Sequence, residues 1–201
     1  MQKTSCNIEA AFIESIRVKQ DILAAGSHKS LIGIGDAIVS KIISGGKLMI
    51  CGNGGSAADA QHLAAELLIR LKPKNNRQGI PAISLAQDSS TLTACGNDFG
   101  YDLIFSRMVE SLGKADDVLL GISTSGNSEN VNLAFQAARK MNILTVGFLG
   151  SMGGPALELC DLNFLAPSND TARIQETHIT AGHALMEHIE DELAAKEFIQ
   201  L

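Results

Sequence analysis

The chain has 201 residues, a formal net charge of −6 and a hydrophobic fraction of 45%. These values predict one folded domain with a substantial apolar core, and they exclude collagen-like, fibrous and disordered proteins. Aromatic residues make up only 4% of the chain, tryptophan is absent and Tyr101 is the single tyrosine, so stacking of nucleic-acid bases is not expected. Nucleic acid and anionic membranes are also disfavoured as partners, because the acidic chain would repel both.

The N-terminus and the cysteines indicate a cytoplasmic protein. The first residues, MQKTSCNIEAAFIES, are charged and lack the apolar stretch of a signal peptide. No later segment reaches the roughly 18 uninterrupted apolar residues that a membrane span requires. Cys6, Cys51, Cys95 and Cys160 show no CxxC spacing, so we expect reduced, partly buried thiols rather than a thiolate zinc site or a disulfide framework.

The first 45 residues predict two helices. Apolar residues recur at helical spacing over residues 9–24 and 30–44, and a glycine-serine pair supplies the break between them. The apolar residues of these two helices that the subunit itself does not bury suit assembly with other subunits. We therefore divide the chain into N-terminal assembly helices, residues 1–45, and an α/β domain, residues 46–201, which together form one structural unit.

From residue 47 onward, short apolar runs alternate with loops rich in glycine and serine and with amphipathic stretches. The expected strands are Leu48–Cys51, Ala82–Leu85, Val118–Ile122, Leu144–Phe148 and Leu162–Leu165. Helical segments are expected at 57–71, 90–94 with 103–112, 129–141 and 154–159, and a long helix begins at Thr171. Nearly continuous apolar strands that alternate with helices predict an α/β fold with a parallel sheet of about five strands. Ligands of such sheets bind beyond the carboxyl ends of the strands.

Two loops that follow strands have a similar composition. One reads CGNGGS over residues 51–56 and the other STSGNS over residues 123–128. Glycines allow a ligand to approach the backbone, hydroxyls donate hydrogen bonds, and the helix that follows offers free N–H groups, which suits a phosphate and sugar hydroxyls. The alternative is a pair of well-capped turns. Neither loop has a P-loop or a G-x-G-x-x-G pattern, so no nucleotide is expected.

The predicted helix after the first loop carries His62 and Glu66, which are four residues apart and lie on one face. This face is roughly opposite the main apolar stripe of the helix. A histidine and a glutamate in this arrangement could supply half of a zinc site or a pair for proton transfer. The alternative is an ordinary solvated helix face.

The last predicted helix contains three histidines. His178 lies on the apolar stripe and His188 at its edge, which is typical of core or interface histidines, whereas His183 projects from the other side and is the functional candidate. Gln175 precedes His183 by eight residues, which is about 12 Å along the axis and about 80° around it. One ion or substrate would meet both side chains only at full stretch, so a composite site at a subunit interface is the easier geometry.

These motifs together resemble the phosphoheptose isomerases of the sugar-isomerase (SIS) domain superfamily. The resemblance rests on CGNGGSAADAQH at residues 51–62, Glu66, GNDFG at 96–100, STSGNS at 123–128, RIQE at 173–176 and His183. It runs from the N-terminal helices almost to the C-terminus with the spacings kept. It implies a single SIS-type domain with a five-stranded parallel sheet, and a homotetramer with active sites at subunit interfaces.

The resemblance also implies an activity and residue roles. The activity is conversion of D-sedoheptulose 7-phosphate into D-glycero-D-manno-heptose 7-phosphate through an enediol, which begins the synthesis of nucleotide-activated heptose for lipopolysaccharide core or capsule. Glu66 and His183 would be the acid/base pair. A zinc ion would be held by His62, Glu66, Gln175 and His183. The substrate would contact Asn53, Gly54, Gly55, Glu66, Asn97, Asp98, Ser123, Thr124, Ser125, Ser128 and Gln175, with the serine-rich loop on its phosphate.

Two other functions fit parts of the pattern. Non-catalytic SIS proteins that bind the replication initiator DnaA share the loops but lack the glutamate and the histidine that this chain has. Isomerases for other sugar phosphates, such as arabinose 5-phosphate, usually carry further domains, for which we expect no room in 201 residues. One departure from the family concerns Ala172, where some members have an acidic residue. Asp170 is the candidate substitute.

Overall fold

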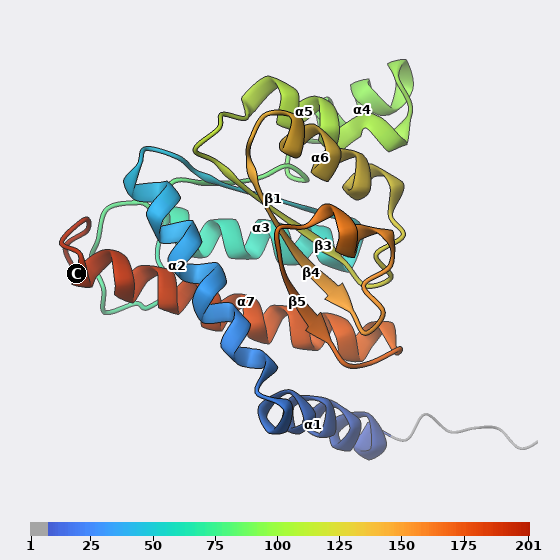
Figure 1. The fold of residues 1–201 in the computed structure, drawn as a ribbon, viewed down its shortest axis with the longest axis vertical. Coiled ribbons are helices and arrows are strands. Elements are labelled where there is room, and N and C mark those ends of the chain that lie inside the picture. Colours follow the sequence, from blue (N-terminus) through green and yellow to red (C-terminus); the bar gives the residue numbers. More distant parts are fainter. Residues whose placement is uncertain (1–7) are drawn as a thin grey trace, which may run out of the picture.

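The protein is described here by a computed structural model covering residues 8–201, so Cys6 lies outside the described residues. Five parallel strands form one sheet in the order β2-β1-β3-β4-β5 (Figure 1). The strands are β1 Leu48–Gly52, β2 Ala82–Ser84, β3 Val118–Ser123, β4 Leu144–Gly150 and β5 Leu162–Ala166. Each begins at its predicted residue and ends within two residues of its predicted end. The expected five-stranded parallel sheet is therefore confirmed.

Across residues 8–201, seven α-helices and three short 3₁₀ segments accompany the sheet. The helices are α1 Ile8–Ala25, α2 Ser30–Ile43, α3 Gly55–Leu68, α4 Ser89–Asp98, α5 Ile104–Leu112, α6 Glu129–Lys140 and α7 Thr171–Ala195. The 3₁₀ segments are η1 Ser27–Lys29, η2 Tyr101–Leu103 and η3 Pro155–Leu159. The segment predicted as a helix at 154–159 is thus a 3₁₀ turn, the form that such short pieces commonly take. Helix α3 ends three residues before its predicted end, because the chain turns back and the amide of Ile80 donates to the carbonyl of Leu67.

The sheet separates two apolar cores. Helices α2, α3 and α7 cover one face, and α5 and α6 cover the other (Figure 1). Side chains alternate along each strand, so Leu48 and Ile50 of β1 enter the first core while Met49 and Cys51 enter the second. All residues of β1 and β3 are buried. Burial on both faces explains why the strands read as continuous apolar runs.

The two N-terminal helices differ in their attachment. Helix α2 packs on α7 within the first core, whereas α1 projects from the body beside one end of α7 and contributes only Val18 and Ile22 to that core (Figure 1). Gly26, with φ +71, forms the break between them that the sequence predicted. The far side of α1 exposes Ile8, Phe12, Ile13, Ile16 and Leu23. The boundary at residue 45 and the assembly role of these helices stay predictions.

Within residues 8–201, no single helix has both the length and the apolar composition to cross a bilayer. The bent pair Ile8–Ala25 and Ser27–Ile43, with 74° between its halves, meets those two criteria only when its members are taken together.

The three described cysteines are free, as the sequence predicted. Cys51 and Cys95 are buried and Cys160 is partly buried. Burial is the main cause that raises the pKa of the Cys51 and Cys160 thiols to about 12. Because the thiolate is the reactive form, these two side chains act as small apolar residues.

Candidate active site

The first glycine-rich loop connects β1 directly to α3. The carbonyl of Asn53 accepts a hydrogen bond from the amide of Ser56 at 3.0 Å, which starts the helix. Gly54 has φ +56, a conformation that favours glycine. Gly55 faces the amide of Gln175, and a Cβ at this position would lie 2.5 Å from Gln175 Nε2. The two glycines therefore allow both the turn and the close approach of α7.

The serine-rich loop connects β3 to α6. The Ser123 hydroxyl lies 3.1 Å from the Ser128 hydroxyl and accepts a hydrogen bond from the amide of Gly126 at 3.1 Å. Gly126 has φ +66, and a Cβ there would lie 1.9 Å from the carbonyl oxygen of Gly153. Beside the loop is a cavity of about 270 Å³ lined by Thr124, Ser125, Asn127, Ser151, Met152, Ser168, Asn169, Thr171 and Ile174. Hydroxyl and amide groups at a helix N-terminus are well suited to bind a phosphate.

The two loops are joined by asparagine side chains. Asn53 and Asn130 exchange amide hydrogen bonds of 2.8 and 2.9 Å, and the Tyr101 hydroxyl donates to Asn53 Oδ1 at 2.9 Å. Sequence reasoning missed Asn130 and the contact of Tyr101. In the sequence, nothing distinguishes Asn130 from a solvent-facing residue of a helix. The single tyrosine, which directly follows the GNDFG motif, was an available signal.

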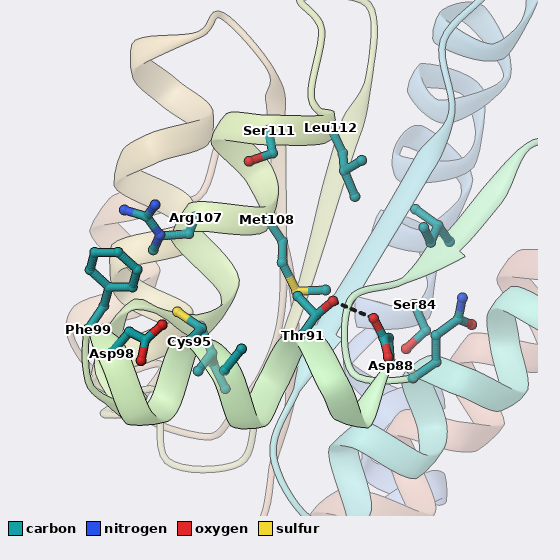
Figure 2. A pocket seen from close by; sticks show the side chains of 14 residues that line it. Ser84, Asp88, Thr91, Cys95, Asp98, Phe99, Arg107, Met108, Ser111 and Leu112 are labelled. Carbon is teal, nitrogen blue, oxygen red and sulfur yellow. Dashed lines mark hydrogen bonds between the residues drawn. The ribbon is translucent and has the colours of Figure 1, made fainter.

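Asn97 and Asp98 lie at the C-terminal end of α4. Asn97 Nδ2 donates to Asp98 Oδ1 at 2.7 Å, and both residues are exposed. Asp98 lines a cavity of about 600 Å³ between β2, α4 and α5 (Figure 2). In the same cavity the guanidinium of Arg107 stands 3.8 Å from the centre of the Phe99 ring. The predicted substrate residues therefore lie at the paired loops, with Gln175 of α7 beside the first loop, at this end of α4, and, for Glu66, on α3.

Helices α3 and α7, which lie side by side, bring three predicted residues together. His62 Nε2 is 2.8 Å from His183 Nε2 and 3.3 Å from Glu66 Oε1. The two imidazole rings meet edge to face, with centroids 5.0 Å apart. Glu66 is more enclosed than His62, with 16% of its side chain exposed against 49% for His62.

His62, Glu66 and His183 form a donor set that fits zinc. Their ligand atoms all lie within 4.8 Å of one another. Two imidazoles and a carboxylate are common zinc ligands, and tetrahedral coordination places two bound nitrogens about 3.3 Å apart. The rings would therefore separate by about half an ångström from the 2.8 Å contact to accept the ion. Gln175 lies against Gly55, about 12 Å along α7 from His183, so its part in the metal site stays a prediction.

Asp59 is a further acidic residue of this site that sequence reasoning missed. It precedes His62 by three residues on α3, so the spacing was a signal. Its Oδ2 atom is buried, with no hydrogen-bond partner among the described residues. Burial raises the pKa of Asp59, while the nearby His62 and His183 act in the opposite direction.

The other two histidines of α7 lie away from this cluster. His178 is fully buried and its Nε2 donates to the carbonyl of Leu149 at 3.0 Å, so the prediction of a core histidine is confirmed. Burial lowers the pKa of His178 to about 4. His188 is partly buried, and its Nε2 lies 2.9 Å from Oδ1 of Asp36 on α2. Asp170, the candidate substitute for an acid at position 172, accepts hydrogen bonds from the amides of Ala172 and Arg173 and so caps α7.

Comparison with known proteins assigns the chain to a family. A family model described as SIS domain matches residues 11–150. A phosphoheptose isomerase of Clostridium acetobutylicum is 46% identical over 187 residues, which are 92% of this chain and 94% of the relative. The chain belongs to the phosphoheptose isomerase family. A second phosphoheptose isomerase, from Aliarcobacter butzleri, is 53% identical over 156 residues, 78% of this chain and 82% of its own.

Solved structures of this family agree with the fold. Phosphoheptose isomerase GmhA from Neisseria gonorrhoeae superimposes with a TM-score of 0.86 at 40% identity, over 92% of this chain and 97% of that one. The family that the motifs indicated is therefore confirmed by both sequence and structure.

Proposed function

We propose that this phosphoheptose isomerase converts D-sedoheptulose 7-phosphate into D-glycero-D-manno-heptose 7-phosphate, the first step toward nucleotide-activated heptose. The observation that carries the proposal is the cluster of His62, Glu66 and His183 in a chain with phosphoheptose isomerase relatives. The DnaA-binding relatives lack the glutamate and histidine of this cluster, which disfavours the adaptor alternative.

The reaction moves a proton between C1 and C2 of the sugar through an enediol. It requires one group that takes the carbon-bound proton and another that transfers the oxygen-bound proton. Glu66 and His183 supply these groups. Glu66 is largely enclosed, and its Oε1 faces His62 at 3.3 Å, which leaves its second carboxylate oxygen for the substrate.

The phosphate of the substrate binds the serine-rich loop through Ser123, Thr124, Ser125 and Ser128. These residues offer hydroxyls and amides at the N-terminus of α6, so a chain of net charge −6 can bind an anion without a cluster of lysines or arginines. The sugar hydroxyls contact Asn53, Gly54, Gly55, Asn97, Asp98 and Gln175. The contact between Gln175 and Gly55 supports a place for the amide beside the first loop.

We also propose that the enzyme uses zinc and works as a cytoplasmic homotetramer. His62, Glu66 and His183 would hold the ion, with Gln175 as a further ligand. Bound zinc would polarise the carbonyl and hydroxyl oxygens of the sugar. The row of exposed apolar side chains on α1 supports an interface between subunits, since monomers rarely leave such a surface uncovered.

The decisive experiment incubates the purified protein with sedoheptulose 7-phosphate and follows the heptose phosphate by NMR. Wild type should turn over the substrate. A lack of turnover both with and without added zinc would refute the proposal. Arabinose 5-phosphate, tested in parallel, should remain unconverted. Light scattering should give the mass of a tetramer, and cell fractionation should place the protein in the cytoplasm.

Three variants test the roles of the acid/base pair. Glu66→Gln and His183→Gln should each abolish turnover and leave the assembly intact. His188→Gln is the matched control, because it removes an imidazole from α7 outside the cluster and should keep the wild-type rate. Deuterium exchange at C1 and C2 in the two inactive variants identifies which residue takes the carbon-bound proton. A Glu66 or His183 variant with a near-wild-type rate would exclude that residue from the mechanism.

A further inference from the structure

A buried ion pair joins the connection after α3 to helix α7. Arg77 Nε lies 2.5 Å from Glu190 Oε2, and both side chains are fully buried. Because desolvation of two charges offsets most of their attraction, a buried pair of this kind is weak evidence for a role in stability. We propose that Arg77 and Glu190 are positioning residues that fix the spacing of α3 and α7 at His62, Glu66 and His183. The inference rests on the function proposed for that cluster.

Arg77 holds the C-terminal end of α3. Its Nη2 donates to the carbonyl of Glu66 at 2.9 Å, and its Nη1 donates to the carbonyls of Leu67 at 2.9 Å and Gln78 at 3.0 Å. The last carbonyls of a helix have no amide of a following turn to bind, and a cation there also meets the negative end of the helix dipole. Arg77 therefore fixes the main chain of Glu66, the candidate acid/base residue itself.

Glu190 holds the matching part of α7. It follows His183 by seven residues, which is two turns or about 10.5 Å along nearly the same face of the helix. Its second oxygen accepts a hydrogen bond from Asn75 Nδ2 at 2.5 Å. The carboxylate is thus bound from two sides, and the face of α7 that carries His183 is connected to the end of α3.

The two helices also touch closely beside His62 and His183. A Cβ at Gly182, next to His183, would lie 2.6 Å from Leu63 Cδ1, next to His62. Dense packing of this kind transmits small displacements. A change in the spacing of the helices therefore alters the 2.8 Å separation of the His62 and His183 nitrogens, and misplacement of reacting groups by about 1 Å can cost about 100-fold in rate.

The test replaces the pair with apolar residues of similar size in the full-length protein, Arg77→Met/Glu190→Leu. Such replacements often preserve stability. Zinc affinity of the metal-stripped protein, measured by competition with a chelating dye, should fall on the order of 10-fold, as for other residues that orient metal ligands. For sedoheptulose 7-phosphate, kcat should fall by a similar factor with KM nearly unchanged. The ring NMR signals of His62 and His183 should shift, while those of His28 stay.

The matched control is Asp117→Asn, which removes a second ion pair whose carboxylate is buried and whose lysine is partly exposed. The Asp117 carboxylate binds Lys47 Nζ at 2.5 Å and the amide of Lys114 at 2.8 Å, at the start of β3 and so at the edge opposite the carboxyl ends of the strands. This variant should lower the melting temperature without a change in zinc affinity or in the histidine signals.

Each outcome decides the inference. A folded double variant with control-like zinc affinity and unshifted His62 and His183 signals would show that the pair is merely structural. If the double variant does not fold, Arg77→Lys makes the same comparison, since lysine keeps the charge but cannot bind three carbonyls and Glu190 together. Shifted signals in a protein whose wild type turns over no sugar phosphate would remove the proposed function and leave the positioning role standing. The ring signals also decide the inference if the wild type binds no zinc.

Discussion

The buried imidazole of His178 should make the fold sensitive to mild acid. Its Nε2–H donates to the carbonyl of Leu149, so the other nitrogen, Nδ1, would have to take the added proton. Nδ1 is buried without a hydrogen-bond partner among the described residues, and burial lowers the pKa from the ordinary 6.5 to about 4. Protonation would therefore place an unpaired cation in the core.

The size of this loss of stability follows from the difference between the pKa of His178 in the folded chain and in the unfolded chain. Below about pH 6.5 the unfolded chain takes up the proton and the folded chain does not, so stability falls as the pH is lowered toward about 4. The full effect is about 3 kcal/mol, of which about 2 kcal/mol is lost by pH 5. Above pH 7 the histidine is neutral in both states and contributes no pH dependence.

Urea unfolding measures the contribution of His178 to the pH dependence of stability. Wild type and His178→Gln are compared at pH 7 and pH 5, at one protein concentration. Glutamine can still donate to the Leu149 carbonyl but does not titrate. Between the two pH values, the wild type should lose about 2 kcal/mol more than the variant. Equal losses in both proteins would refute the assignment of the acid sensitivity to His178.

Three further predictions concern the candidate site. Gly182→Ala should destabilise the protein by about 1–3 kcal/mol in thermal unfolding, because its Cβ would collide with Leu63, whereas Gly33→Ala on α2, where nothing lies within 4 Å, should be neutral or stabilising. Tyr101→Phe removes the donor to Asn53 and should raise KM about two- to tenfold with little change in kcat, in steady-state assays; an unchanged KM would separate Tyr101 from substrate binding. Chelation of divalent metals should lower the activity, and added zinc should restore it in wild type but not in His62→Gln.

The strands were predictable because helices cover both faces of the sheet, so five short apolar runs stand out against polar loops. The end of α3 was not, since the amphipathic pattern continues to Leu71. What ends the helix at Leu68 is tertiary: distant groups, the Arg77 side chain and the Ile80 amide, take its last carbonyls. Local periodicity contains no information about such partners.

The same distinction applies to the candidate site. His62 and Glu66 are one helical turn apart, so their pairing can be read from spacing alone. His183 reaches His62 across 121 residues and Glu190 reaches Arg77 across 113, and no local rule predicts either contact. Helical periodicity marked His183 as a candidate and the resemblance to a family gave it a role and a partner, whereas Arg77 and Glu190 belong to none of the motifs that carried the resemblance.

The groups proposed for proton transfer stand on two long helices, whereas those proposed for the phosphate stand on a loop between a strand and a helix. These two parts of the molecule can therefore change at different rates in evolution. Substitutions within residues 123–128 can alter which phosphorylated tail is accepted while α3 and α7 keep the acid and base in register. A family built in this way can acquire new sugar substrates without inventing its chemistry again.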